Sequence, residues 1–198
     1  MVQRVLAIDP GQKGALAWVN LRGDLIQIED IPLVDNEVNA KLLANLVVAY
    51  GSLECAVVER QQAMPPELQG RRQGNASAFK HGTGYGIIIG VLAALNIPTF
   101  FLTPSQWKSG MGLSKDKELS RKKAIDRWPS QADEYFKLKK NEGRAEAALM
   151  AVSWIQSDLR SQMLPTLQGE ETRPNSRRRL IRRYQETDPT TVSELEHD

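Results

Sequence analysis

Short apolar runs punctuated by turn residues dominate the first 60 residues and recur once later. Each run is too short for a helix and is rich in β-branched or aromatic residues, which is typical of strands. A segment that is apolar throughout, such as LECAVVER, indicates a strand buried on both faces. The predicted strands are residues 4–9, 14–20, 24–31, 53–60 and 99–102.

Elsewhere the apolar positions recur every three to four residues, which predicts helices. Asn36 is a candidate N-cap and Gly51 a stop signal for the first helix, and Thr103 with Pro104 begins another. The predicted helices are residues 36–50, 75–96, a short one from 104, 115–128 and 142–161.

This order of elements predicts an α/β domain with a mixed sheet. Right-handed crossovers through the helices would bring strands 4–9, 53–60 and 99–102 side by side. We place this domain at residues 1–164. Residues 165–198 contain few apolar residues and clustered charge, including SRRRLIRR, and we predict a disordered tail.

The amino-acid composition limits the kind of metal site that the chain could form. The chain of 198 residues has one cysteine and two histidines, too few for an ordinary zinc site, so any metal would be a hard cation held by carboxylates. Neither a secretory signal nor a membrane span is apparent, and we expect a cytoplasmic protein of a bacterial or phage-infected cell.

Charge is unevenly distributed along the chain. Residues 1–70 hold 5 Lys/Arg against 9 Asp/Glu, whereas residues 71–144 hold 14 against 6. This pattern suggests a polyanion-binding surface beside a cation-binding pocket. The alternative is that the lysine-rich helices are merely solvated.

Two acidic residues come at the C-terminal ends of predicted apolar strands. Asp9 ends LAID and Glu59 ends AVVE, and the predicted crossovers would place both at one edge of the sheet. A buried carboxylate is costly unless it is paired, hydrogen-bonded or bound to metal. Asp9-Pro10-Gly11 is also an ordinary turn sequence, so the turn alone could explain the aspartate.

Two further acids, Glu142 and Glu146, lie four residues apart on the inward side of the last predicted helix. Singly, each could be a surface or capping carboxylate. Together with Asp9 and Glu59 they predict a site for Mg²⁺ or Mn²⁺ suited to two-metal phosphodiester hydrolysis. There, one ion lowers the pKa of the attacking water and the other stabilises the leaving 3′ oxygen.

An ordered set of motifs supports a family resemblance between Val5 and about Trp154. The chain resembles the RuvC-type Holliday-junction resolvases of the RNase H-like superfamily, particularly the divergent phage and prophage versions. The motifs are LAIDPGQKGALA, AVVERQQAMP, FKHGTGYGIIIGVLAAL, TPSQWKSGMGLSKDKELSRKKAIDRWP and EGRAEAALMA. The resemblance implies an RNase H-like mixed five-stranded sheet flanked by helices. It also implies a homodimeric endonuclease that cuts four-way or otherwise branched DNA with two Mg²⁺ ions and no nucleotide cofactor.

By position, Asp9 and Glu59 match the first two acids of that family, and Glu142 and Glu146 match its final pair. The family usually has Asp at one or both of the last two positions, often three residues apart, so which glutamate binds metal stays open. Lys117 matches a lysine beside the scissile phosphate. The predicted catalytic residues are therefore these four acids and Lys117.

Several basic residues are candidates for holding DNA. They are Arg71, Arg72, Lys80, Lys115, Arg121 and Lys122. We expect the loop bracketed by Met64, Pro65 and Phe79 to insert at the junction centre. The glycines of HGTGYGIIIG follow no strand and open no βαβ unit, so they favour close approach to the sheet or to a second subunit over dinucleotide binding.

Three other functions fit parts of the pattern. An actin-type or sugar-kinase phosphate loop also reads DxGxxxG, but the chain has no room for the second lobe those proteins need. An RNase H-fold nuclease acting on RNA precursors, and a catalytically decayed DNA-junction-binding protein, both remain open.

Overall fold

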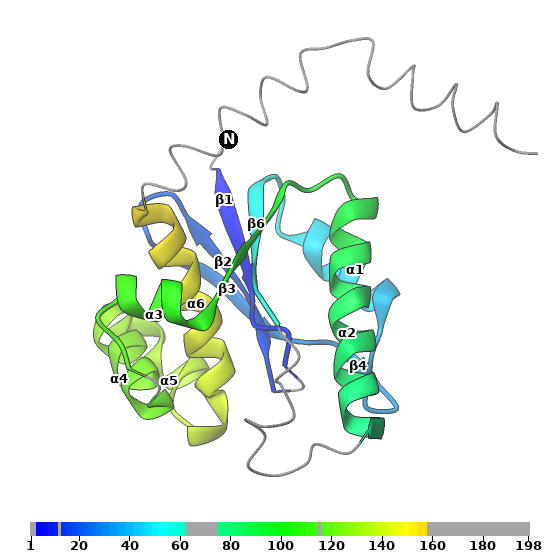
Figure 1. Ribbon diagram of the computed structural model, residues 1–198. Helices are drawn as coiled ribbons and strands as arrows, with labels where there is room; N and C mark the ends of the chain where they lie inside the picture. The colour runs from blue at the N-terminus through cyan, green and yellow to red at the C-terminus, as the bar shows by residue number, and fades with distance from the viewer. Residues whose placement is uncertain (1–2, 12, 62–74, 115, 158–198) are drawn as a thin grey trace, which may run out of the picture. The chain divides into compact units, whose positions relative to one another are not determined.

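A mixed five-stranded sheet, in the order β3-β2-β1-β6-β7, lies at the centre of the fold (Figure 1). The computed structural model describes residues 3–11, 13–61, 75–114 and 116–157. β1, β2 and β3 pair antiparallel, and β1, β6 and β7 pair parallel, as the predicted crossovers require. The strands are β1 (Arg4–Ile8), β2 (Ala15–Asn20), β3 (Leu25–Asp30), β6 (Leu53–Glu59) and β7 (Thr99–Leu102).

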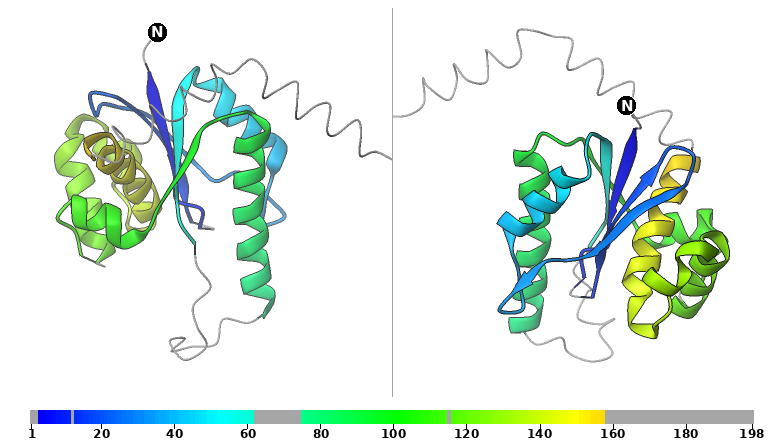
Figure 2. Two further views of the ribbon diagram at one scale, coloured as in Figure 1. Left: turned by 45° about the horizontal axis from the view of Figure 1, so that its top comes forward. Right: turned by 180° about the vertical axis from the view of Figure 1, so that it is seen from behind.

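Helices cover both faces of the sheet (Figures 1 and 2). One face carries α1 (Ala40–Ala49) and α2 (Asn75–Ala94). The other carries α6 (Glu142–Gln156), with α3 (Pro104–Gly110), α4 (Lys117–Arg127) and α5 (Ala132–Tyr135) around it. Two 3₁₀ turns, Pro129–Gln131 and Lys139–Asn141, connect the last helices. The predicted mixed five-stranded sheet flanked by helices is confirmed.

Alternation along the strands explains the different packing of the two faces. Large side chains such as Leu6, Ile8 and Trp18 form a core with α1 and α2. The intervening positions, among them Ala7 and Ala17, point to the opposite face. Small residues on that face let α6 lie close against β1 and β2, and α6 is itself rich in buried alanines.

The first predicted helix starts later than expected. α1 begins at Ala40, and its N-cap is Asn39, whose side chain accepts the amide of Leu42 at 3.0 Å. Asn36 instead lies in the turn between β4 (Leu33–Val34) and β5 (Glu37–Val38), with Asp35 at φ 51° and Asn36 at φ 65°. Two consecutive left-handed residues are what a tight two-residue hairpin requires, and Asn and Asp tolerate them.

Other boundaries differ by a few residues. α4 begins at Lys117 after the N-cap Asp116, and α6 ends at Gln156 rather than residue 161. α5 and the 3₁₀ turns were not predicted, because their polar sequence lacks an apolar periodicity. The capping role of Thr103 is confirmed by a full capping box with Gln106.

The chain divides into Met1–Ser157 and Asp158–Asp198. The second unit lies outside the described residues, and with it the predicted tail. Within the described ranges, no helix is both long and apolar enough to cross a membrane.

An ion pair ties the start of α6 to the end of β3. Arg144 donates through Nε and Nη2 to the two carboxylate oxygens of Asp30, both at 2.7 Å. This two-pronged bond holds the pKa of the Asp30 carboxyl below its ordinary value of 3.8. The carboxylate therefore favours the folded state wherever it is ionised.

Asp30→Asn should lower the urea midpoint of unfolding at pH 7. The depressed pKa means that the contribution of Asp30 is complete above pH 3.8 and is lost as the pH falls through the lower, folded-state pKa. The difference between variant and wild type should therefore shrink between pH 5 and pH 2.5. Asp133→Asn is the control, because its side chain is 92 % exposed and 3.5 Å from Lys137. A pH-independent difference for Asp30→Asn would contradict the assignment.

Candidate active site

The parallel pairing of β1 and β6 brings two acids to one edge of the sheet. Ile8 pairs with Val58, so Asp9 and Glu59 come one residue later on neighbouring strands. Asp9 also makes the turn: its amide donates to Ala15 O at 3.0 Å, and its Oδ1 accepts the amide of Gly11 at 3.2 Å. The turn and a site at the strand end are therefore compatible explanations of the same aspartate.

The first turn of α6 lies directly against the loop after β1. A Cβ added at Gly143 would be 2.2 Å from Lys13 O and 3.1 Å from Asp9 Oδ2, so only glycine permits this approach. Gly143 stands between Glu142 and Glu146, and the contact therefore carries both glutamates to the Asp9 loop. The inward orientation predicted for Glu146 is confirmed, since the residue is 6 % exposed.

All four acids line one open pocket of about 820 Å³. Lysines share its walls, so the pocket carries both signs of charge. Among the described residues, no three His, Cys, Asp or Glu side chains gather closely enough to form a metal-holding group. The structure thus brings the predicted acids into a common pocket, and a metal site built from them stays a prediction. The charged residues lining it are Asp9, Lys13, Glu59, Lys108, Lys139, Lys140, Glu142 and Glu146.

Glu59 is held by neighbouring side chains. Trp107 donates Nε1–H to Glu59 Oε1 at 2.9 Å, and Gln61 donates Nε2–H to Oε2 at a longer 3.4 Å. Gln61 Oε1 lies 3.0 Å from Nε2 of His81 on α2. In the tautomer that carries a proton on this nitrogen, His81 donates to the amide oxygen of Gln61. These contacts fix the direction in which the Glu59 carboxylate points.

Glu146 pairs with Lys108, a residue that sequence reasoning did not single out. The Lys108 Nζ to Glu146 Oε1 distance is 2.6 Å, and both side chains are largely buried, at 12 % and 7 % exposure. Lys108 and Trp107 both lie on α3, which directly follows β7, the neighbour of β6 in the sheet. The sequence signal that could have pointed to Lys108 and Trp107 is their position just after β7, which is the neighbour of β6 in the sheet.

No known protein family matches the sequence, and no curated protein matches it. Solved structures do resemble the chain in fold. RuvC of Thermus thermophilus in complex with a Holliday junction substrate is 20 % identical, with a TM-score of 0.51, over 76 % of this chain and 91 % of that one. Another structure of Thermus thermophilus RuvC is 18 % identical, with a TM-score of 0.55, over 76 % and 94 %. The chain has the RuvC fold. The RNase H-like class expected from the motifs is thereby confirmed.

The predicted DNA-binding residues that the structure describes lie in three different environments within this fold. Lys122 is exposed on α4, and Lys80 lines a second pocket beside α2. The guanidinium of Arg121 is engaged by Glu118 and by the carbonyl of Phe136 at 3.0 Å. Arg121 therefore holds α4 to the segment after α5.

Other predictions fall outside the described residues. They concern the loop residues Met64, Pro65, Arg71 and Arg72, and Lys115. Lys117 begins α4, but its side chain is also outside what the structure describes.

Lys108→Met should destabilise the protein by about 3–5 kcal/mol in urea unfolding at pH 7, because it leaves the buried Glu146 carboxylate without its cation. The double variant Lys108→Met/Glu146→Gln should recover most of this loss, since the uncompensated charge is gone. Lys139→Met is the matched control: an exposed lysine of the same pocket, expected to change stability little. A double variant no more stable than Lys108→Met would contradict the ion pair as the cause.

Gly143→Ala should lower the free energy of unfolding by about 1–3 kcal/mol, because the new Cβ collides with the carbonyl of Lys13. Thermal unfolding measures the effect. Gln156→Ala, at an exposed position on the same helix, is the control and should leave the melting temperature nearly unchanged. An unchanged melting temperature for Gly143→Ala would show that α6 does not press against the loop.

Proposed function

We propose that the protein is a metal-dependent, structure-selective endonuclease that cuts four-way or otherwise branched DNA. One observation carries the proposal: four carboxylates from β1, β6 and α6 line a single pocket in a chain with the RuvC fold. The RuvC structure solved with a Holliday junction substrate supports branched DNA as the class of substrate.

The donor set of the pocket fits hard divalent cations. Carboxylate oxygens are the ligands preferred by Mg²⁺ and Mn²⁺. Glu146 already binds a cationic group in the structure, since the Lys108 ammonium lies 2.6 Å from its Oε1. Asp9, Glu59, Glu142 and Glu146 would hold the ions, which when bound supply a water of lowered pKa and neutralise charge on the phosphate.

The protein's own residues provide orientation and attraction. Trp107 and Gln61 hold Glu59 through its two carboxylate oxygens, which removes rotational freedom before substrate arrives. Lys13, Lys139 and Lys140 lie on the same pocket walls and are exposed to solvent. Their charge would draw the anionic backbone toward the acids and make binding strongly salt-dependent.

A homodimer is part of the proposal. Gly82, Gly86 and Gly90 follow one another at four-residue intervals on α2, and a Cβ added at any of them meets nothing within 4 Å. This open face without side chains supports a close approach by the α2 helix of a second copy. Two copies would provide the paired cuts that resolve a four-way junction symmetrically.

The deciding experiment compares cleavage of a labelled four-way junction with that of a matched linear duplex, in Mg²⁺, in Mn²⁺ and in EDTA. Wild type should make paired, symmetric nicks in the junction only when metal is present. Glu59→Gln and Glu146→Gln should each reduce the cleavage rate at least 100-fold, because each removes a charged oxygen donor from the pocket.

Glu134→Gln, an exposed acid on α5, is the matched control and should cut like wild type. Tight junction binding without cutting in any metal would instead indicate a catalytically decayed binder. Cleavage of structured RNA with no preference for the junction would support the RNA-processing alternative.

A further inference from the structure

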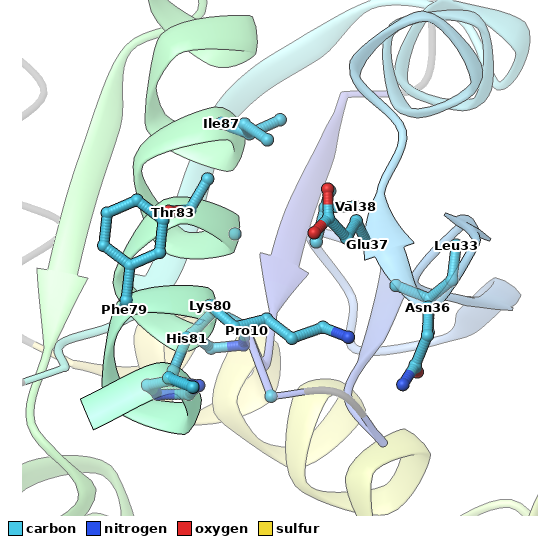
Figure 3. Close-up of a pocket in the computed structure, with 13 residues that line it drawn as sticks. Pro10, Leu33, Asn36, Glu37, Val38, Phe79, Lys80, His81, Thr83 and Ile87 are labelled. Carbon is cyan, nitrogen blue, oxygen red and sulfur yellow. The ribbon is translucent and has the colours of Figure 1, made fainter. Parts of the chain in front are cut away.

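A second pocket, of about 370 Å³, lies between α2 and the β4–β5 hairpin (Figure 3). Its volume is within the range of roughly 300–1,000 Å³ found for small-molecule sites. Pro10 and Gly11, the two residues after Asp9, form part of its wall. Gly11 also lines the acidic pocket, so the two pockets are neighbours across the loop that follows β1.

An exposed aromatic ring marks the α2 side of this pocket. Phe79 is 78 % exposed, more than any other exposed large hydrophobic residue in the described part of the chain. Phe79, Thr83 and Ile87 follow at four-residue intervals and line the α2 wall together (Figure 3). Within the described part of the chain little of this ring is covered, and an aromatic face at the edge of a pocket is suited to stacking.

Polar side chains complete the pocket. Lys80 extends from α2 across the opening toward the hairpin, and Glu37 faces it from β5 (Figure 3). His81 and Asn36 add further hydrogen-bonding groups. A nucleotide site needs a surface on which the base stacks, a cation for the phosphate and hydrogen-bonding groups for the edge of the base. The pocket offers an aromatic ring, an ammonium group and polar side chains for these three purposes.

We propose that this pocket binds one unpaired nucleotide of branched DNA, with its base stacked on Phe79 and its phosphate on Lys80. The inference rests on the proposed function, because the two pockets share Gly11 and a strand whose phosphate occupies the acidic pocket would continue past it toward Phe79.

The pocket is also connected to the acidic site through hydrogen bonds. His81 lines the nucleotide pocket and bonds Gln61, which in turn donates to Glu59. A nucleotide in the pocket would thus contact a group that helps orient one of the four acids. Continuous base stacking is interrupted at a branch point, so a base there is freed at lower cost than in a continuous duplex, and the pocket would favour branched substrates.

The test measures binding by fluorescence anisotropy in EDTA, where cutting is prevented. The probes are a four-way junction, a series of junctions each lacking one base near the branch point, a linear duplex and a short thymidine oligonucleotide. Phe79→Ala and Phe79→Leu should weaken binding of the intact junction about 5- to 150-fold, because both lose the stacking ring. Phe79→Tyr should bind like wild type, and duplex affinity should be unchanged in all three variants.

The series of abasic junctions locates the base. At one position, removing the base should weaken wild type and cancel the further effect of Phe79→Ala, which is the signature of a direct contact. Val48→Ala, an equally simple truncation of an exposed apolar residue on α1, should change none of the affinities. An effect of Phe79→Ala that is the same on every abasic junction would overturn the proposal.

Two further outcomes separate this proposal from others. If Phe79→Ala weakens junction and duplex binding alike and changes the sedimenting mass, the ring contacts a second copy of the chain and the nucleotide assignment is wrong. If wild type shows no preference for the junction, the proposed function fails. Binding of the thymidine oligonucleotide then tests the nucleotide pocket by itself. Weaker binding by Phe79→Ala than by wild type would support the pocket assignment, and equal binding would overturn it.

Discussion

The close approach of α6 to the loop after β1 is the constraint on which the candidate site depends. Gly143 has no side chain, and none would fit between the helix and the carbonyl of Lys13. Because Glu142 and Glu146 flank this glycine, the contact sets their depth in the pocket. The Arg144–Asp30 ion pair holds the same turn of α6 to β3. The position of two acids thus follows from backbone packing.

The other two acids are positioned by the sheet. β1 and β6 run parallel, with Ile8 opposite Val58, so Asp9 and Glu59 emerge at the same edge of the sheet. α3 then supplies Trp107 and Lys108, which bind Glu59 and Glu146 respectively. Acids and lysines share the pocket walls, and each of these two carboxylates already has a donor. The arrangement therefore combines exposed lysines with carboxylates whose orientation is fixed by neighbouring side chains.

Much of this organisation could be predicted from the sequence, because it depends on local signals. The apolar runs predicted every strand of the sheet, and an acid at the end of two of them predicted the edge where the pocket lies. The hairpin at Asp35–Asn36 was misread because Asn is favoured both at helix N-caps and in left-handed turns. Lys108 was missed because its partner lies 38 residues away, and its position just after β7 was the only local signal that pointed to the site.

The four acids come from distant parts of the chain: position 9, position 59, and positions 142 and 146. No fragment that lacks α6 contains more than half of them, and α6 is the last element of the described fold to leave the ribosome. A partly synthesised or partly unfolded chain is therefore incapable of assembling the pocket, however much of the sheet it has formed. The order of elements along the chain thus links formation of the acidic pocket to completion of the domain, because a chain that ends before α6 has only the sheet side of the pocket.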